Sequence, residues 1–299
     1  MGEQNTAVTP DINIMTFKKQ SAIKETWRRM RKSAAAMIGL VVVVLMILSV
    51  IFADVIVSYN KAIEQDVAIR LNSPSIKNIF GTDLYGRDVF ARIIHGGRVS
   101  LSIGFISTFI SLVIGLFFGA AAGFYGGKTD NMIMRFTDVL SVIPTILLAL
   151  AIVSSLGPGM RNLIIAISIS RIPVFIRIIR SAVMGVVDME FIEAAKAGGG
   201  KDMHIILTHI LPNSMGTIIV QTTMNISTVI LQAAVLSFIG MGVEPPRPEW
   251  GYMLNEAREY MRTSMYLLIF PGVCICLAAL SLNLLGDGLR DALDPRLKS

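Results

Sequence analysis

Six predominantly apolar runs dominate this sequence and set what it can fold into. A helix that crosses a bilayer needs about 20 such residues. The runs cover about residues 34–57, 99–125, 133–156, 161–180, 214–240 and 264–286. Only 16% of the 299 residues are charged and the mean hydropathy is +0.64, against about 25% charged in soluble domains. The sequence therefore predicts an all-α membrane protein with six transmembrane helices.

Basic residues near the ends of the runs indicate the orientation. Seven precede the first run, namely Lys18, Lys19, Lys24, Arg28, Arg29, Arg31 and Lys32. Positive charge favours the cytoplasmic side, so we expect the N-terminus there, and six crossings return the C-terminus, with Arg290, Arg296 and Lys298, to the same side. The first run is longer than the apolar core of a signal peptide, which indicates a retained first span.

The runs and this orientation divide the chain into five regions. These are a cytoplasmic N-terminal segment (1–33), a first transmembrane helix (34–57), an extracytoplasmic segment (58–98), a five-helix core (99–286) and a cytoplasmic C-terminal tail (287–299). The net charge of +6 is explained by membrane orientation, and we expect lipid rather than nucleic acid as a contact.

Two faces within the spans carry patterns at helical spacing. In the second span Gly115, Gly119 and Gly123 recur every four residues, which predicts a close helix-packing face. In the fifth span the polar residues Thr217, Gln221, Asn225, Thr228 and Gln232 follow one stripe. Polar side chains avoid lipid, so this polar stripe either forms hydrogen bonds between helices or lines a hydrophilic pathway; we favour the pathway.

Arg171 lies inside the fourth run, two residues before Pro173. An ionisable residue deep in a span is a functional candidate, so we include Arg171 among the pathway residues. The alternative is a structural pair with a carboxylate of a neighbouring helix or a partner subunit.

The segment 188–213, here called the docking segment, contains the letters GGGK. A phosphate-binding loop needs G-x-x-x-x-G-K-[ST] after a strand. With its lysine placed on Lys201, the first glycine falls on Ala195 and the hydroxyl residue on Asp202, so the motif fails. Helix signals fit better: Asp188 is expected to cap a first helix, Gly198–Gly200 to end it, and Pro212 to end a second amphipathic helix.

Residues of the docking segment resemble the EAA loop of prokaryotic ABC-importer membrane subunits. The match comprises Glu193, Ala194, Ala195, Gly199 and the terminal Ile210, Leu211 and Pro212. The stretches FGTDLYGRDVFARIIHGGRVSLSIG, LSFIGMGVEPPRPEWGYML and FPGVCICLAALSLNLLGDGLRDALDPRL resemble the dipeptide, oligopeptide and nickel permeases, and their second permease subunit in particular. Related sequences often have Trp at the position of Arg171 and Glu at that of Ala233. Both departures lie in spans, so the resemblance extends to the family and not to the role of Arg171 or the substrate specificity.

This resemblance implies a type I ABC-importer transmembrane domain that is a transport subunit, not an enzyme. The implied partners are a second homologous permease, two ATPase subunits that hold the ATP and Mg, and an extracytoplasmic substrate-binding protein; this chain itself would bind no cofactor. It implies that Glu193, Ala194, Ala195, Gly199, Leu211 and Pro212 couple the chain to an ATPase. Peptides are the expected substrate, with nickel or another metal chelate as the alternative.

Two other classes of protein fit the sequence less well. An intramembrane enzyme lacks the H-E-x-x-H and G-x-S-x-G motifs, and we identify no catalytic or metal-binding residue. His204 and His209 are five residues apart and do not share a helix face. A stand-alone channel or secondary transporter would have no use for a docking segment.

Overall fold

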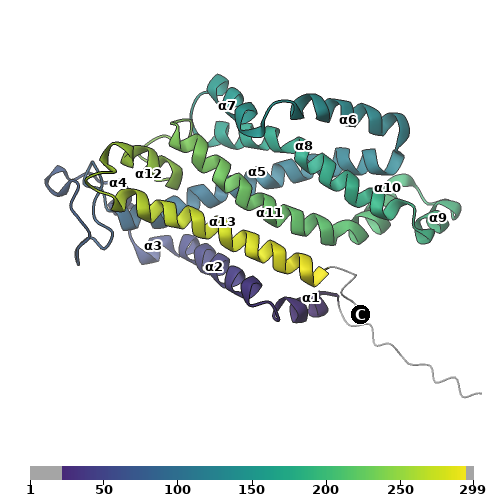
Figure 1. The fold of residues 1–299 in the computed structure, drawn as a ribbon, viewed down its shortest axis with the longest axis horizontal. Helices are drawn as coiled ribbons and strands as arrows, with labels where there is room; N and C mark the ends of the chain where they lie inside the picture. The colour runs from purple at the N-terminus through teal and green to yellow at the C-terminus, as the bar shows by residue number, and fades with distance from the viewer. Residues whose placement is uncertain (1–21, 294–299) are drawn as a thin grey trace, which may run out of the picture.

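Five long helices lie side by side along the length of the molecule in the computed structural model, which describes residues 22–293 (Figure 1). They are α2 (Ala34–Ile51), α5 (Val89–Tyr125), α8 (Met160–Val187), α11 (Leu211–Phe238) and α13 (Tyr266–Leu293). Each is long and apolar enough to cross a membrane. No β-strand occurs in the described range. The predicted all-α membrane fold is confirmed.

The third span along the chain is broken into two helices. α6 (Gly127–Ser141) and α7 (Thr145–Leu156) follow one another with a bend of 77° between them. Pro144, which precedes α7, has no N–H to continue the helix and disfavours helical geometry at Ile143. The span predicted over about 133–156 is therefore made of two helices joined by a bend. In Figure 1, α7 begins between the two ends of the bundle, next to α8.

The second span starts ten residues earlier than the sequence predicted, because α5 begins at Val89. Asp88 caps it by accepting a hydrogen bond from the Ala91 N–H at 2.8 Å. The polar residues Arg92 and His95, which look like a surface segment in the sequence, are each only 2% exposed. Arg92 contacts Asp83, and His95 contacts the Val57 carbonyl. The boundary predicted between residues 98 and 99 falls inside this continuous helix.

Glycines bring α5 and α8 into close contact. A Cβ built on Gly115 would lie 2.6 Å from the Cβ of Phe175, and one on Gly119 would lie 2.8 Å from the carbonyl oxygen of Ile176. Gly123 meets Val183 in the same way at 2.8 Å. Contacts this short leave no room for a side chain, so the two backbones approach as closely as glycine allows.

The two ends of the bundle carry different short elements (Figure 1). At one end lie α1 (Ala22–Met30), the last turn of α13, α9 (Glu190–Ala197) and α10 (Asp202–Ile205). At the other end lie α3 (Ala53–Ile56), α4 (Tyr59–Ile63), the loop that follows α4, and α12 (Trp250–Ala257). The docking segment and α1, which carries Lys24, Arg28 and Arg29, therefore share one end.

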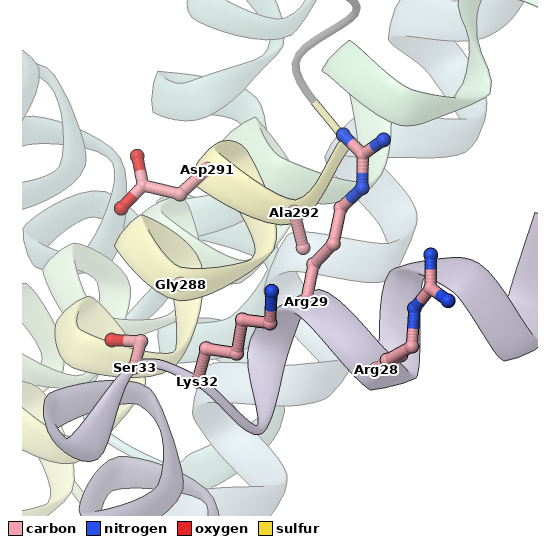
Figure 2. A pocket seen from close by; sticks show the side chains of 7 residues that line it. All are labelled: Arg28, Arg29, Lys32, Ser33, Gly288, Asp291 and Ala292. Carbon is pink, nitrogen blue, oxygen red and sulfur yellow. The ribbon is translucent and has the colours of Figure 1, made fainter. Parts of the chain in front are cut away.

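Between α1 and α13 the chain leaves a pocket of about 440 Å³ (Figure 2). Its lining residues are Arg28, Arg29, Lys32, Ser33, Gly288, Asp291 and Ala292. Arg29 is paired with Glu25 at 2.5 Å, and Asp291 is the one carboxylate in the lining. The other basic residues that indicated orientation, Lys18, Lys19, Arg296 and Lys298, lie outside the described residues.

Candidate functional site

Helix α9 contacts the bundle through Ile192 and Lys196 and leaves its other face exposed. Ile192 is fully buried in an apolar cluster that includes Val183 of α8 and Ile205 of α10. The Lys196 ammonium lies 5.1 Å above the ring of Phe124 in α5. The neighbouring Phe191, Glu193 and Ala194 are exposed. The EAA residues thus lie on a short rod that is anchored to three helices of the core.

The start of α9 differs from the prediction. Its N-cap residue is Met189, and no side chain accepts a hydrogen bond from the first turn. Asp188 instead ends α8, which stays helical as far as Val187. Because its backbone already closes the preceding helix, Asp188 is one residue too early to cap the next one. The predicted Asp188 cap was wrong.

The end of α9 lies where the glycines predicted it, and it is a fixed cap. Gly199 has φ +77°, a conformation that L side chains rarely adopt. Its N–H donates to the Lys196 carbonyl at 3.0 Å, and the Gly200 N–H donates to the Ala195 carbonyl at 3.1 Å. These two bonds are the Schellman arrangement that satisfies the last carbonyls of a helix.

Pro212 does not end the second helix of the docking segment. α10 is followed by a π-helical turn (Ile206–Ile210) and then directly by α11, in which Pro212 occupies the first turn. The Leu211 N–H donates to the Ile206 carbonyl, five residues back. A proline removes one α-helical hydrogen bond, and the wider turn accommodates this loss. The docking segment therefore continues into the fifth span without an interruption, contrary to the prediction.

The free face of the docking segment is apolar and well exposed. Met189, Phe191, Met203 and Leu207 are 46%, 42%, 60% and 57% exposed. Of the predicted coupling residues, Glu193, Ala194, Gly199 and Pro212 are exposed and Ala195 and Leu211 are half-buried. Exposed apolar side chains gathered beside charged ones are typical of a protein interface.

The predicted polar stripe on α11 divides in two. Thr217 and Thr228 are exposed and Gln221 is half-buried, whereas Asn225 and Gln232 are buried within the chain. The Asn225 amide donates to the carbonyl of Gln221, one turn earlier, at 2.8 Å. One part of the stripe therefore faces out of the chain, and the other faces its interior.

The structure brings two predicted residues, Arg171 and Gln232, together. The Nε of Arg171 donates to Oε1 of Gln232 at 2.9 Å, and Nε2 of Gln232 lies 3.2 Å from the Thr145 carbonyl and 3.3 Å from Oγ of Ser170. Arg171 is 8% exposed and Gln232 is 5% exposed. This polar centre joins α7, α8 and α11 in the interior of the bundle.

At the opposite end from the docking segment, four buried charges form a cluster that the sequence did not predict. Arg87 donates to Asp83 at 2.6 Å and to Glu256 at 2.8 Å; Arg92 pairs with Glu256 at 2.7 Å and also with Asp83. All four side chains are at most 8% exposed. The cluster fastens the loop before α5 to α12. The i,i+4 spacing of Asp83 and Arg87 was its one sequence signal.

A second buried carboxylate anchors α12 to α5. Glu249 caps α12 by accepting hydrogen bonds from the N–H groups of Gly251 and Tyr252 at 2.9 and 2.8 Å, and from the Ser100 hydroxyl at 2.9 Å. The Nε1–H of Trp250 donates to the Ile93 carbonyl at 2.9 Å. Burial raises the pKa of Glu249, and the hydrogen bonds that it accepts offset this rise in part.

Two protein-family models match this chain. Residues 111–299 match the family described as the binding-protein-dependent transport system inner membrane component. Residues 21–74 match the N-terminal transmembrane domain of oligopeptide transport permease C. Fold, helix count and family together define a multi-pass inner-membrane subunit of a transport system. The chain belongs to the binding-protein-dependent transport system inner membrane component family, as a permease of the ABC-importer type.

Relatives match it over nearly its whole length. The dipeptide transport system permease protein DppC of Alkalihalophilus pseudofirmus is 45% identical over 296 residues, which cover 98% of this chain and 97% of that protein. The glutathione transport system permease protein GsiD of Escherichia coli O6:K15:H31 is 44% identical over 291 residues, 96% of each chain. An inward-facing structure of the MetNI methionine ABC transporter shares the fold, with a TM-score of 0.57, 19% identity, and coverage of 69% of this chain and 97% of that one.

Proposed function

We propose that this chain forms one half of the translocation pathway of an ATP-driven importer of short peptides. The observation that carries the proposal is its identity of 45% and 44%, over nearly the full length, with permeases named for dipeptide and glutathione transport. Glutathione is itself a short peptide, so both names point to one class of substrate.

The partners we propose are a second homologous permease, two ATPase subunits and an extracytoplasmic substrate-binding protein. ATP and Mg belong to the ATPase subunits in this assignment. The end of the bundle that carries α9, α10 and α1 is the cytoplasmic end, because basic residues gather there. The opposite end, with α12 and the buried charge cluster, then faces the binding protein.

Coupling to the ATPase runs through the docking segment. The exposed Phe191, Met203 and Leu207 supply apolar contact area, and Glu193 supplies a charge. A displacement of α9 is transmitted to α8 through the buried Ile192. A displacement of α10 is transmitted to α11 because the two form one continuous helix. Such rigid connections are what coupling between two sites requires. The remaining coupling residues in this proposal form the rest of the docking surface and the ends of its helices. They are Ala194, Ala195, Gly199, Leu211 and Pro212.

The test is reconstitution of the purified chain with its second permease, ATPases and binding protein in liposomes. We expect uptake of a radiolabelled dipeptide that depends on ATP and is absent when this chain is left out. A complex that takes up ⁶³Ni²⁺ or a nickel chelate with ATP, and no dipeptide, would replace the peptide assignment with the metal one.

A further inference from the structure

Arg171 is a buried cation in the middle of a membrane span. It lies about 16 Å along α8 from Met160, at 1.5 Å per residue, and 8% of its surface is exposed. A charge at this depth costs at least a few kcal/mol unless a partner compensates for it. The position therefore calls for a counter-charge.

The part of the chain that the structure describes offers Arg171 no counter-charge. No carboxylate among residues 22–293 forms an ion pair with it within 4.0 Å. The acidic residues of α6 that pair with α8 do so further along the helix, Asp138 with Arg177 and Asp130 with Arg180. Its one hydrogen bond in this range uses Nε and goes to Gln232. The two terminal nitrogens have no hydrogen-bond partner among the described residues, and they do not belong to the fully buried polar atoms.

A second group of unpaired donors lies at the start of α7, whose first residue is linked to Arg171 through Gln232. α7 starts in the middle of the bundle because its span is broken at Pro144, and no side chain caps it. Its first backbone hydrogen bond joins the Leu148 N–H to the Pro144 carbonyl at 3.0 Å, so the N–H groups of residues 145–147 have no acceptor among residues 22–293. The N-terminus of a helix carries partial positive charge and favours an anion.

Gln232 ties these two features to one place. Its Oε1 accepts from Arg171 while its Nε2 lies within hydrogen-bond distance of the Thr145 carbonyl at the first residue of α7. Both ends of the amide are used, so the guanidinium is held by Nε with its terminal nitrogens free. Thr228, one turn earlier on α11, is exposed on the part of the stripe that faces out of the chain. The site is thus adjacent to the predicted pathway.

We propose that Arg171 and the open N-terminus of α7 bind the C-terminal carboxylate of the peptide during its passage, with Gln232 as the positioning residue. A carboxylate matches the fork of a guanidinium with two parallel hydrogen bonds and accepts backbone N–H groups as well. A broken helix whose N-terminus faces an anionic substrate group is a known arrangement in transporters. This inference rests on the proposed peptide import. A carboxylate could also come from the second permease, and the experiment separates the two sources.

The experiment compares ATP-driven uptake of a radiolabelled dipeptide and of its C-terminal amide by the full complex in liposomes. The variants are Arg171→Gln and Arg171→Lys, and the matched control is Arg177→Gln, an exposed arginine of the same helix. We expect Arg171→Gln to lower uptake of the free acid by about tenfold or more, as loss of a charge-assisted hydrogen bond predicts. Uptake of the amide should change by less than about twofold and the subunit ratio should stay normal. Arg171→Lys keeps the charge but loses the bidentate fork, so it should lower uptake of the free acid by less than Arg171→Gln does.

Three results would contradict the proposal. Arg171→Gln could lower uptake of the free acid and of the amide by the same factor, or could lower neither. In both cases Arg171 does not recognise the carboxylate. The second permease could fail to co-purify with Arg171→Gln, which would assign the carboxylate to that subunit. If Arg171→Gln does not accumulate, Arg171→Lys decides: the proposal requires its acid-to-amide uptake ratio to fall below that of the wild type, and an unchanged ratio would contradict it. A wild-type complex without peptide uptake would instead overturn the proposed function.

Discussion

Arg171 and Gln232 are 61 residues apart in the chain, yet the Nε of one donates to Oε1 of the other at 2.9 Å. The bond fastens α8 to α11, and the remaining hydrogen bonds of Gln232 extend it to α7. The sequence indicated each residue by a different signal. Arg171 is an ionisable residue inside a span, and Gln232 belongs to a polar stripe at helical spacing. Their contact makes them one site that connects three spans.

The first prediction concerns the charge at this site. Gln232→Glu gives Arg171 a carboxylate partner within the chain, so we expect peptide uptake to fall strongly while the thermal unfolding midpoint holds or rises. Gln232→Leu is the comparison, because it removes the hydrogen bonds and leaves the guanidinium unpaired. It should lower stability by about 1–3 kcal/mol. Normal uptake by Gln232→Glu would show that the free guanidinium is not needed.

The second prediction concerns the contact between α5 and α8. Gly115→Ala places a Cβ 2.6 Å from that of Phe175, so the helices must separate. We expect a loss of about 1–3 kcal/mol of stability, measured as the unfolding midpoint in detergent. Gly185→Ala is the matched control, because nothing lies within 4 Å of the new methyl group and alanine favours a helix. Equal midpoints for the two variants would contradict the close packing.

The third prediction concerns the buried charge cluster. Glu256→Ala leaves Arg87 and Arg92 with Asp83 as their shared carboxylate, and removing one member of a buried pair costs about 3–5 kcal/mol. We expect a lower unfolding midpoint and faster proteolysis between α4 and α5. Asp54→Ala breaks the exposed pair with Arg98 and should cost less than about 1 kcal/mol. Proteolysis of Glu256→Ala at the wild-type rate would refute the role of the cluster as a fastener.

The fourth prediction concerns pH. The pKa of Glu249 is raised by burial, so the folded chain holds this proton more tightly than the unfolded chain does. The stabilising contribution is fully present below the unfolded pKa of about 4.3 and is lost as pH rises through the folded pKa. Glu249→Gln keeps an oxygen acceptor for α12 and does not ionise. We expect the midpoint of the wild type, relative to this variant, to fall as pH rises above about 4.3; a difference independent of pH would contradict the raised pKa.

Much of the fold could be predicted from the sequence because the relevant signals are local. Apolar runs located the spans, the glycines at 115, 119 and 123 lie against α8, and the glycines after Ala197 end α9. The effect of each proline could not be predicted in the same way. Pro144 breaks a span, whereas Pro212 begins one, and the difference depends on the π-helical turn before Pro212. Local propensity does not register such a turn.

The sites were harder to predict than the spans, because they are made by residues distant in the chain. The bond between Arg87 and Glu256 joins positions 169 apart, and that between Ser100 and Glu249 joins positions 149 apart. A single sequence gives the residue types of these pairs and not the pairing. Within the docking segment, the glycines that end α9 were predictable because they follow the helix directly, whereas the Asp188 cap and the end at Pro212 were wrong.

We infer that the docking segment transmits the conformational changes of the ATPase cycle to the membrane spans. This transmission is tested most directly by measuring ATP hydrolysis and dipeptide uptake together in the reconstituted complex, with Glu193→Lys in α9 against the control Lys128→Glu, an exposed charge change in α6. We predict that Glu193→Lys weakens co-purification of the ATPases and lowers uptake by about tenfold or more, while Lys128→Glu stays near the wild type. Undiminished uptake with Glu193→Lys would contradict the claim.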